Sequence, residues 1–353
     1  MFAVRLAKAL AIIVAAVVSA NGCSHSTRPP TSSPSAASNP ASTHSLFTTA
    51  APWNADISGA AKAERSEAII HALTAMGGWG TGGLHVDFSM PVFFADRNAP
   101  QVQVVGAADY CYGGRDCDTV PARMPLPANA YFEGSPNPNC DTSGATEGQE
   151  DCHLLVVDRD QRKLYEIYHG SKSGENLTAQ GFFVWDLTKQ YPDTLRGDQC
   201  TSADAAGFPI AAMTPTADEV ASGIVDHAIR FILPNNRMKA GVYVRPATHA
   251  GGPDSTDANA PPYGVRFRLR ADFDESGYSK SERVIIAALK KYGMLLSDGG
   301  QVPLTFADDR TSTKKWAELG ISAQSFNGIA VDQFEVVQLG PEVKLTYDCV
   351  RNQ

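Results

Sequence analysis

Charged residues are scarce in this sequence, and positive charge is the scarcer sign. Of 353 residues, 19% are charged and 43% are hydrophobic, a balance that excludes a disordered chain and a coiled coil. Only one short apolar run occurs, near the N-terminus, which excludes a polytopic membrane protein. Lysine and arginine number 30 against 38 aspartates and glutamates. Nucleic acid is therefore disfavoured as a partner, because phosphates demand clustered basic residues.

The N-terminus is typical of an export signal. Arg5 and Lys8 precede an apolar run over residues 9–18, and small residues follow. Residues 20–23 (ANGC) resemble the lipobox of bacterial lipoproteins, which implies cleavage before Cys23 and diacylation of its sulfur. We therefore expect a signal peptide over residues 1–22 and a membrane anchor at Cys23, with the protein facing the periplasm or the cell exterior. The alternative is ordinary signal-peptidase cleavage after residue 20.

Composition then divides the remaining chain. Removal of the signal leaves 28 basic against 38 acidic residues and a net charge of −10. Residues 23–52 are rich in Ser, Thr, Pro and Ala, so we expect a disordered linker there. Residues 53–353 are predicted to form a single β-rich domain. Within it, residues 109–150 are expected to be an irregular insertion that carries cysteines.

The chain has seven cysteines, and lipidation of Cys23 leaves an even number. An even number in an exported protein predicts disulfides. Six cysteines allow 15 pairings, which the sequence does not distinguish; of these we expect Cys111 with Cys117, Cys140 with Cys152 and Cys200 with Cys349. No Cys-x-x-Cys pair occurs, so no metal site is predicted, and the sequence does not indicate a cofactor.

Short strand patterns dominate the domain and predict a mainly β fold, an antiparallel β-sandwich or jelly roll with a few peripheral helices. Residues 154–158 and 164–168 form the clearest hairpin pattern. The other candidate strands lie at residues 84–89, 101–105, 182–187, 228–233, 242–244, 265–270, 334–339 and 343–347.

Helices are expected at four places. The strongest pattern spans residues 280–292, where Ser279 and Glu282 form a capping box and Gly293 ends the helix. Residues 65–75 also show an apolar face. Residues 216–221 and 313–319 are weaker candidates.

Several short motifs recur in order in a largely uncharacterised group of secreted bacterial proteins. These are TSADAAGFPI at 201–210, HAIRF at 227–231, YVRPATH at 243–249, GVRFRL at 264–269 and LKKYGM at 289–294. The chain resembles that group over roughly residues 151–336, and Arg245 stands where the other members carry Trp. The resemblance implies export and assigns no activity.

Histidines and acids near predicted strands are candidates for chemistry. His153, His227 and His249 each lie at or beside a strand with acids close by. They could converge as a metal site, they could supply acid–base groups, or they could be half-buried and bonded to backbone. Asp204, in the small-residue loop 201–207, could act as an acid or could close an Asx turn. Asp158 and Glu219 complete the candidate catalytic set.

Arginines alternate with apolar residues in two strands. Arg266, Arg268 and Arg270 share one face, and Arg230 lies in another strand. Such a face could bind an anionic glycan or phosphate, together with His153 and Arg245, or it could be a solvated face paired with acids.

These observations favour a lipoprotein that acts on polysaccharide by hydrolysis or elimination. A carboxylate pair drawn from Asp158, Asp204 and Glu219, with His227 or His249, would supply acid–base catalysis. The alternative is a non-catalytic surface lipoprotein that binds glycan, peptidoglycan or a partner protein.

Overall fold

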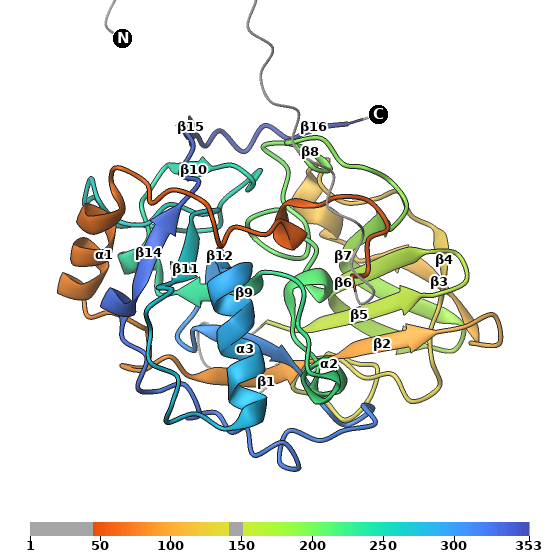
Figure 1. Ribbon diagram of the computed structural model, residues 1–353. Helices are drawn as coiled ribbons and strands as arrows, with labels where there is room; N and C mark the ends of the chain where they lie inside the picture. The colour runs from red at the N-terminus through yellow and green to blue at the C-terminus, as the bar shows by residue number, and fades with distance from the viewer. Residues whose placement is uncertain (1–44, 141–150, 353) are drawn as a thin grey trace, which may run out of the picture. The chain divides into compact units, whose positions relative to one another are not determined.

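Most of the expected strands, together with β2 (Val92–Ala95), β4 (Ala122–Pro125), β12 (Met294–Gly299) and β13 (Leu304–Ala307), which the sequence did not indicate, form two mixed sheets of six strands each (Figure 1). This computed structural model describes residues 45–140 and 151–352. The predicted mainly β class is confirmed, and helices are few. The signal peptide and Cys23 lie outside the described residues.

Sheet A contains two parallel pairs, β1 with β13 and β9 with β12, and its other pairs are antiparallel. In spatial order its strands are β1 (Val86–Met90), β13 (Leu304–Ala307), β9 (Ile229–Leu233), β12 (Met294–Gly299), β11 (Arg266–Leu269) and β14 (Phe334–Val337).

Sheet B is built around the predicted hairpin, which the structure confirms as β5 and β6 with Asp158 opposite Lys163. In spatial order its strands are β2 (Val92–Ala95), β5 (His153–Asp158), β6 (Lys163–Ser173), β7 (Asn176–Asp186), β3 (Gln101–Gly106) and β4 (Ala122–Pro125). Its pairs β2 with β5 and β3 with β7 are parallel. The expectation of wholly antiparallel sheets is therefore wrong, because chain crossovers bring distant segments together in parallel.

Two short ribbons complete the β structure. They pair β10 (Val242–Val244) with β15 (Glu342–Lys344), and β8 (Gly197–Asp198) with β16 (Val350–Arg351).

Both faces of sheet B are buried, which explains the apolar runs in its strands. Leu155 and Val157 of β5 join the core shared with sheet A, whereas Leu154 and Val156 join a second core on the opposite face. Alternate residues of a strand point to opposite faces, so His153 also belongs to the face toward the shared core. That placement determines the position of the site described below.

Three α-helices occur among the described residues, α1 (Ser66–Ala75), α2 (Ala217–Ser222) and α3 (Lys280–Lys291). Capping boxes begin α2 at Thr216 and α3 at Ser279, as predicted for α3. Short 3-10 helices are η1 (Pro52–Asn54), η2 (Tyr110–Gly113), η3 (Ala211–Met213), η4 (Asn235–Arg237) and η5 (Val331–Gln333).

The helix expected at residues 313–319 is wrong, because that segment forms turns. Asp309 accepts a hydrogen bond from the backbone N–H of Trp316, and Lys315 donates to carbonyl groups of Asp309, Arg310 and Ser312. These bonds replace the regular helical ladder.

Residues 45–52, which were expected to belong to the linker over residues 23–52, are packed against the domain, and residues 23–44 lie outside the described residues. Phe47 is buried in the shared core, where its ring packs edge-on against Trp53 at 5.1 Å. Thr48 donates its backbone N–H to Leu187. An aromatic side chain that buries its surface can order a short segment, so this part of the chain belongs to the domain.

The cysteine-containing insertion is only partly irregular. It contributes β4, which pairs with β3 at the edge of sheet B, and it packs Tyr131 and Phe132 against the outer core of that sheet. Residues 141–150 lie outside the described residues. The sequence did not indicate β4 because this strand is short and contains Arg123 and Pro125.

All three predicted disulfides are confirmed: Cys111–Cys117, Cys140–Cys152 and Cys200–Cys349. They indicate an oxidising, extracytoplasmic environment. Within the described part of the chain, no helix has the length and apolar character needed to span a membrane.

Candidate functional site

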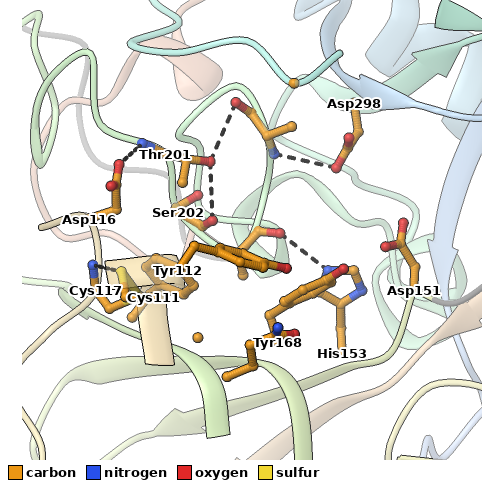
Figure 2. A pocket seen from close by; sticks show the side chains of 16 residues that line it. Cys111, Tyr112, Asp116, Cys117, Asp151, His153, Tyr168, Thr201, Ser202 and Asp298 are labelled. Atoms are coloured by element: carbon orange, nitrogen blue, oxygen red, sulfur yellow. Dashed lines mark hydrogen bonds between the residues drawn. A yellow bond between two sulfur atoms is a disulfide. The ribbon is translucent and has the colours of Figure 1, made fainter. Parts of the chain in front are cut away.

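A pocket of about 330 Å³ opens where sheet B meets loop 201–205 and the end of β12 (Figure 2). Sheet B provides one wall, and Asp298 of sheet A lies across from it. Polar and aromatic lining residues include Tyr112, Asp116, Asp151, His153, Tyr168, Gln180, Thr201, Ser202 and Asp298.

One row of sheet B forms the floor of the pocket. His153 on β5 pairs with Tyr168 on β6, and Tyr168 pairs with Gly181 on β7. The rings of His153 and Tyr168 are 5.5 Å apart. A Cβ atom at Gly181 would lie 3.3 Å from Tyr168 Cβ and 2.9 Å from the Phe183 ring, so glycine leaves room for both rings. The row therefore presents one aromatic face to the pocket.

Asp298 lies at an irregularity of β12. The register against β9 shifts between Leu296 and Asp298, and such bulges redirect side chains. Asp298 accepts hydrogen bonds from the guanidinium of Arg230 at 2.9 Å and from the backbone N–H groups of Ala205 and Gly299. Burial raises its pKa above the ordinary value, Arg230 opposes that shift, and Asp151 adds to it.

Arg230 is held between two carboxylates. Its Nε donates to Asp204 at 2.7 Å, one terminal nitrogen donates to Asp298, and the other donates to Thr305 at 2.8 Å. Asp204 is fully buried and does not reach the pocket. Burial raises the pKa of Asp204 to about 7, even though Arg230 opposes the shift.

His153 is held in its charged form. Its Nδ1 lies 2.7 Å from Glu133, and its Nε2 lies 3.2 Å from the carbonyl oxygen of Ala203. Burial alone would lower the pKa of His153, but the hydrogen bond and charge of Glu133 outweigh it and raise the pKa to about 9. Because both ring nitrogens donate, His153 is occupied and positions the pocket wall.

The rim of the pocket is tied by the Cys111–Cys117 disulfide. Cys111 and Tyr112 both have left-handed backbone, with φ of 54° and 47°. Such conformations carry a cost for residues other than glycine and collect at functional sites. Tyr112 is 73% exposed and lies over the pocket opening, close to Tyr168 (Figure 2).

Loop 201–207 forms the wall opposite sheet B. Asp204 accepts the backbone N–H of Ala206, which is the expected Asx turn, while its other oxygen binds Arg230. The contacts of Asp204 are therefore those of the Asx-turn interpretation together with a buried ion pair, and they do not bring the carboxylate to the pocket. Ser202 donates to the Phe208 carbonyl at 2.5 Å and so closes the loop. Gly207 has φ of 83°, and a Cβ there would lie 2.1 Å from Thr248 Oγ1.

Four of the sequence candidates gather around this pocket: His153, Asp204, Arg230 and His249. His249 lies behind the wall, where its Nδ1 binds the Ala205 carbonyl at 2.9 Å and burial lowers its pKa. Of the four, only His153 lines the pocket.

Glu219 and His227 belong to a different place. They lie 3.5 Å apart, and Glu219 lines a second pocket of about 780 Å³ beside α2. Glu219 also caps α2 through Thr216, and His227 binds the carbonyl oxygen of Ala228 at 2.8 Å. A joint site with Asp204 is therefore wrong, because the two groups line or adjoin separate pockets.

Asp158 and Arg245 have local roles. Asp158 accepts the backbone N–H groups of Asp160 and Gln161 and closes the β5–β6 turn. Arg245 pairs with Asp198 at 2.8 Å at the partly exposed edge of β10.

The expected exposed cationic face on β11 is wrong. Arg266 and Arg268 are 4% and 8% exposed, because residues 52–60 cover them. Arg266 donates to carbonyl groups of Pro52, Ala55 and Tyr292, and Arg268 donates to those of Ile57, Ser58 and Ala60.

Asp298, Asp151, Tyr112 and Tyr168 line the pocket and were not predicted as site residues. A signal for Asp298 was present: the buried run of β12 ends at this acid, followed by two glycines. The tyrosines carried no signal, because their proximity depends on sheet register and on the disulfide loop.

A metal ion has no evident ligand set among the residues with described positions. Asp116 lies near the sulfurs of Cys200 and Cys349, but those two sulfurs form a disulfide. A bonded sulfur is not a thiolate ligand, so Asp116 stands alone there.

Comparison with protein-family models, curated proteins and solved structures finds no match to this chain. Its function must therefore be inferred from the geometry of the pocket.

Proposed function

We propose that this chain is an exported lipoprotein that hydrolyses a glycan in the pocket between sheet B and Asp298. The observation that carries the proposal is that two carboxylates with different surroundings, Asp298 and Asp151, line one pocket beside aromatic rings. Glycoside hydrolysis commonly needs one carboxylic acid and one carboxylate.

Asp298 suits the role of general acid. Burial raises its pKa, so the carboxylate can take up a proton and give it to the glycosidic oxygen as the C–O bond breaks. Asp151 is exposed and suits the role of base, taking a proton from the water that attacks the anomeric carbon. One water molecule is thereby divided between the two products.

Tyr112 and Tyr168 suit the binding of a sugar ring. Aromatic rings offer flat apolar surface with a hydroxyl at the edge, which matches the faces and hydroxyls of a pyranose. Tyr112 is largely exposed and Tyr168 is partly exposed, so both can contact a ligand.

The export part of the proposal rests on the N-terminal sequence and the disulfides. The lipobox-like residues 20–23 and the Ser/Thr/Pro-rich segment support a domain tethered to a membrane by Cys23. Three disulfides fit the compartment that such an anchor implies. The resemblance of residues 151–336 to secreted bacterial proteins also supports export from the cytoplasm.

The test incubates the full chain with neutral, basic and acidic polysaccharides and with peptidoglycan in water enriched in oxygen-18. Hydrolysis predicts fragments that each carry one heavy oxygen at the new reducing end. Elimination would give unsaturated ends without that label and would contradict the proposed chemistry. Retained glycan binding without fragments would favour a binding lipoprotein instead.

Asp151→Asn is the matched variant for this assay, because its side chain is exposed and similar in size. Loss of a general base lowers the rate about 10²- to 10⁴-fold. Unchanged fragment release by this variant would remove Asp151 from the mechanism.

A further inference from the structure

Two carboxylates in the pocket, Asp116 and Asp151, form no ion pair within the described residues, whereas Asp298 is paired with Arg230. Asp116, Asp151 and Asp298 line the pocket, and none of the lining residues within the described ranges is lysine or arginine. Asp116 accepts the backbone N–H of Thr201 at 2.7 Å, and Asp151 is exposed. A ligand in this pocket therefore meets carboxylate oxygens on more than one side.

Three cations beside the pocket are already occupied. Both ring nitrogens of His153 are taken by Glu133 and the Ala203 carbonyl. Arg230 is shared by Asp204 and Asp298. Arg351, which donates to the Asp116 backbone carbonyl, is paired with Asp118 at 2.7 Å. An anionic sugar would therefore find no lysine or arginine among the described residues that line the pocket, and burying an unpaired charge is costly.

From these contacts we infer that the pocket selects amino sugars with a free ammonium group over neutral sugars, and excludes uronic acids. The inference rests on the proposed function and names its substrate class. Asp116 and Asp151, which both line the pocket, attract the ammonium group. Coulomb attraction of this kind weakens with salt.

The test titrates the full chain calorimetrically with sulfur-linked trisaccharides, which resist hydrolysis, of glucosamine, N-acetylglucosamine and galacturonic acid. We expect the glucosamine trisaccharide to bind about tenfold more tightly than its acetylated form, a difference of about 1.4 kcal/mol. Salt at about 1 M should remove most of that difference. The galacturonic acid trisaccharide should not bind.

Two variants test the charge. Asp116→Asn keeps the acceptor for Thr201 and should weaken the binding of the glucosamine trisaccharide alone. Asp332→Asn, on exposed η5, is the control and should change none of the affinities.

The outcomes divide clearly. Equal or tighter binding of the acidic or acetylated trisaccharide overturns the charge selection while leaving the proposed glycan site in place. Absence of binding by all three trisaccharides, together with no fragment release from any polysaccharide, overturns the proposed function and this inference together.

Discussion

Asp204 and Asp298 share the guanidinium of Arg230 inside the protein, and that sharing defines the chemistry of each residue. Asp204 is sealed and completes an Asx turn, whereas Asp298 keeps 18% of its side chain exposed toward the pocket. The same cation thus supports a structural acid and a candidate catalytic one. A buried charge that loses its partner destabilises the fold by several kcal/mol.

Replacement of Arg230 should therefore be severe. Arg230→Met leaves two buried carboxylates without a cation, and we expect a loss of about 3–5 kcal/mol in the free energy of unfolding at pH 7. Urea denaturation measures this loss. The triple variant that combines Arg230→Met with Asp204→Asn and Asp298→Asn should recover part of it, and no recovery would contradict the ion-pair explanation.

The titration of Glu166 should make the stability of the protein depend on pH. It is fully buried, accepts hydrogen bonds from Trp185 Nε1 and the Ala211 N–H, and burial raises its pKa from 4.5 to about 7. The pKa of Glu166 is higher in the folded protein than in the unfolded chain, so protonated Glu166 stabilises the fold. This stabilisation is complete below pH 4.5 and is lost as pH rises through 7. At about 1.4 kcal/mol per pKa unit, the loss is about 3 kcal/mol.

Glu166→Gln should flatten that dependence. The variant lacks the ionisation, so its midpoint in urea should fall less than that of the wild type between pH 5 and pH 8. Equal falls in both proteins would show that Glu166 does not titrate in this range.

At the scale of elements, β11 is fastened to the N-terminal segment by arginines. Arg268 donates to three carbonyl groups of residues 57–60 and also pairs with Glu335 at 2.7 Å. Arg270, on the same side of the chain, is 48% exposed and pairs only with Asp272 among the described residues. Substitutions at Arg268 and Arg270 therefore compare a buried arginine with an exposed one on the same side of the chain.

Arg268→Met should release residues 57–60. We expect faster amide hydrogen exchange in that segment and a loss of about 2 kcal/mol in stability, because several buried carbonyl groups lose their donor. Arg270→Met should leave both quantities within about 0.5 kcal/mol of the wild type. Equal effects at the two positions would contradict the fastening role of Arg268.

The sequence predicted correctly those elements that a few neighbouring residues determine. The capping box at Ser279 and the β5–β6 hairpin were correct, because caps and turns act over a few residues. The strands β12 and β13 were missed, since buried strands of this kind read as uninterrupted apolar runs. The β11 arginines were assigned to the surface because nothing in the strand reveals what covers it.

The site was harder to predict for the same reason. His153 and Arg230 were chosen from residue type and position, and they do adjoin the pocket. Asp298 and Tyr168 line the same pocket only because the two sheets pack together, and no local sequence pattern encodes that packing.

At the scale of the whole molecule, disulfides hold the C-terminus and the pocket rim. Cys200–Cys349 closes 149 residues of chain, and Cys111–Cys117 closes only six. A longer loop loses more entropy on closure in the unfolded chain, so its disulfide stabilises more.

The two disulfides should therefore differ in effect. Removing Cys200–Cys349 by double alanine substitution should lower stability by about 5 kcal/mol, and removing Cys111–Cys117 by about 2 kcal/mol. Glycan binding should follow the opposite order at temperatures where both variants are folded, because Cys111–Cys117 lies at the rim beside Tyr112. Thermal melting and calorimetry measure the two effects, and the reverse ranking in stability would contradict this assignment.

The most direct measurement is the rate of fragment release by the wild type, by Asp298→Asn and by the exposed control Asp332→Asn, on one glycan that the wild type cleaves. The proposed mechanism predicts that Asp298→Asn loses at least about 10²-fold in rate while it remains folded, and that the control is unchanged. Fragment release by Asp298→Asn at the wild-type rate would contradict the proposal that this pocket performs the cleavage.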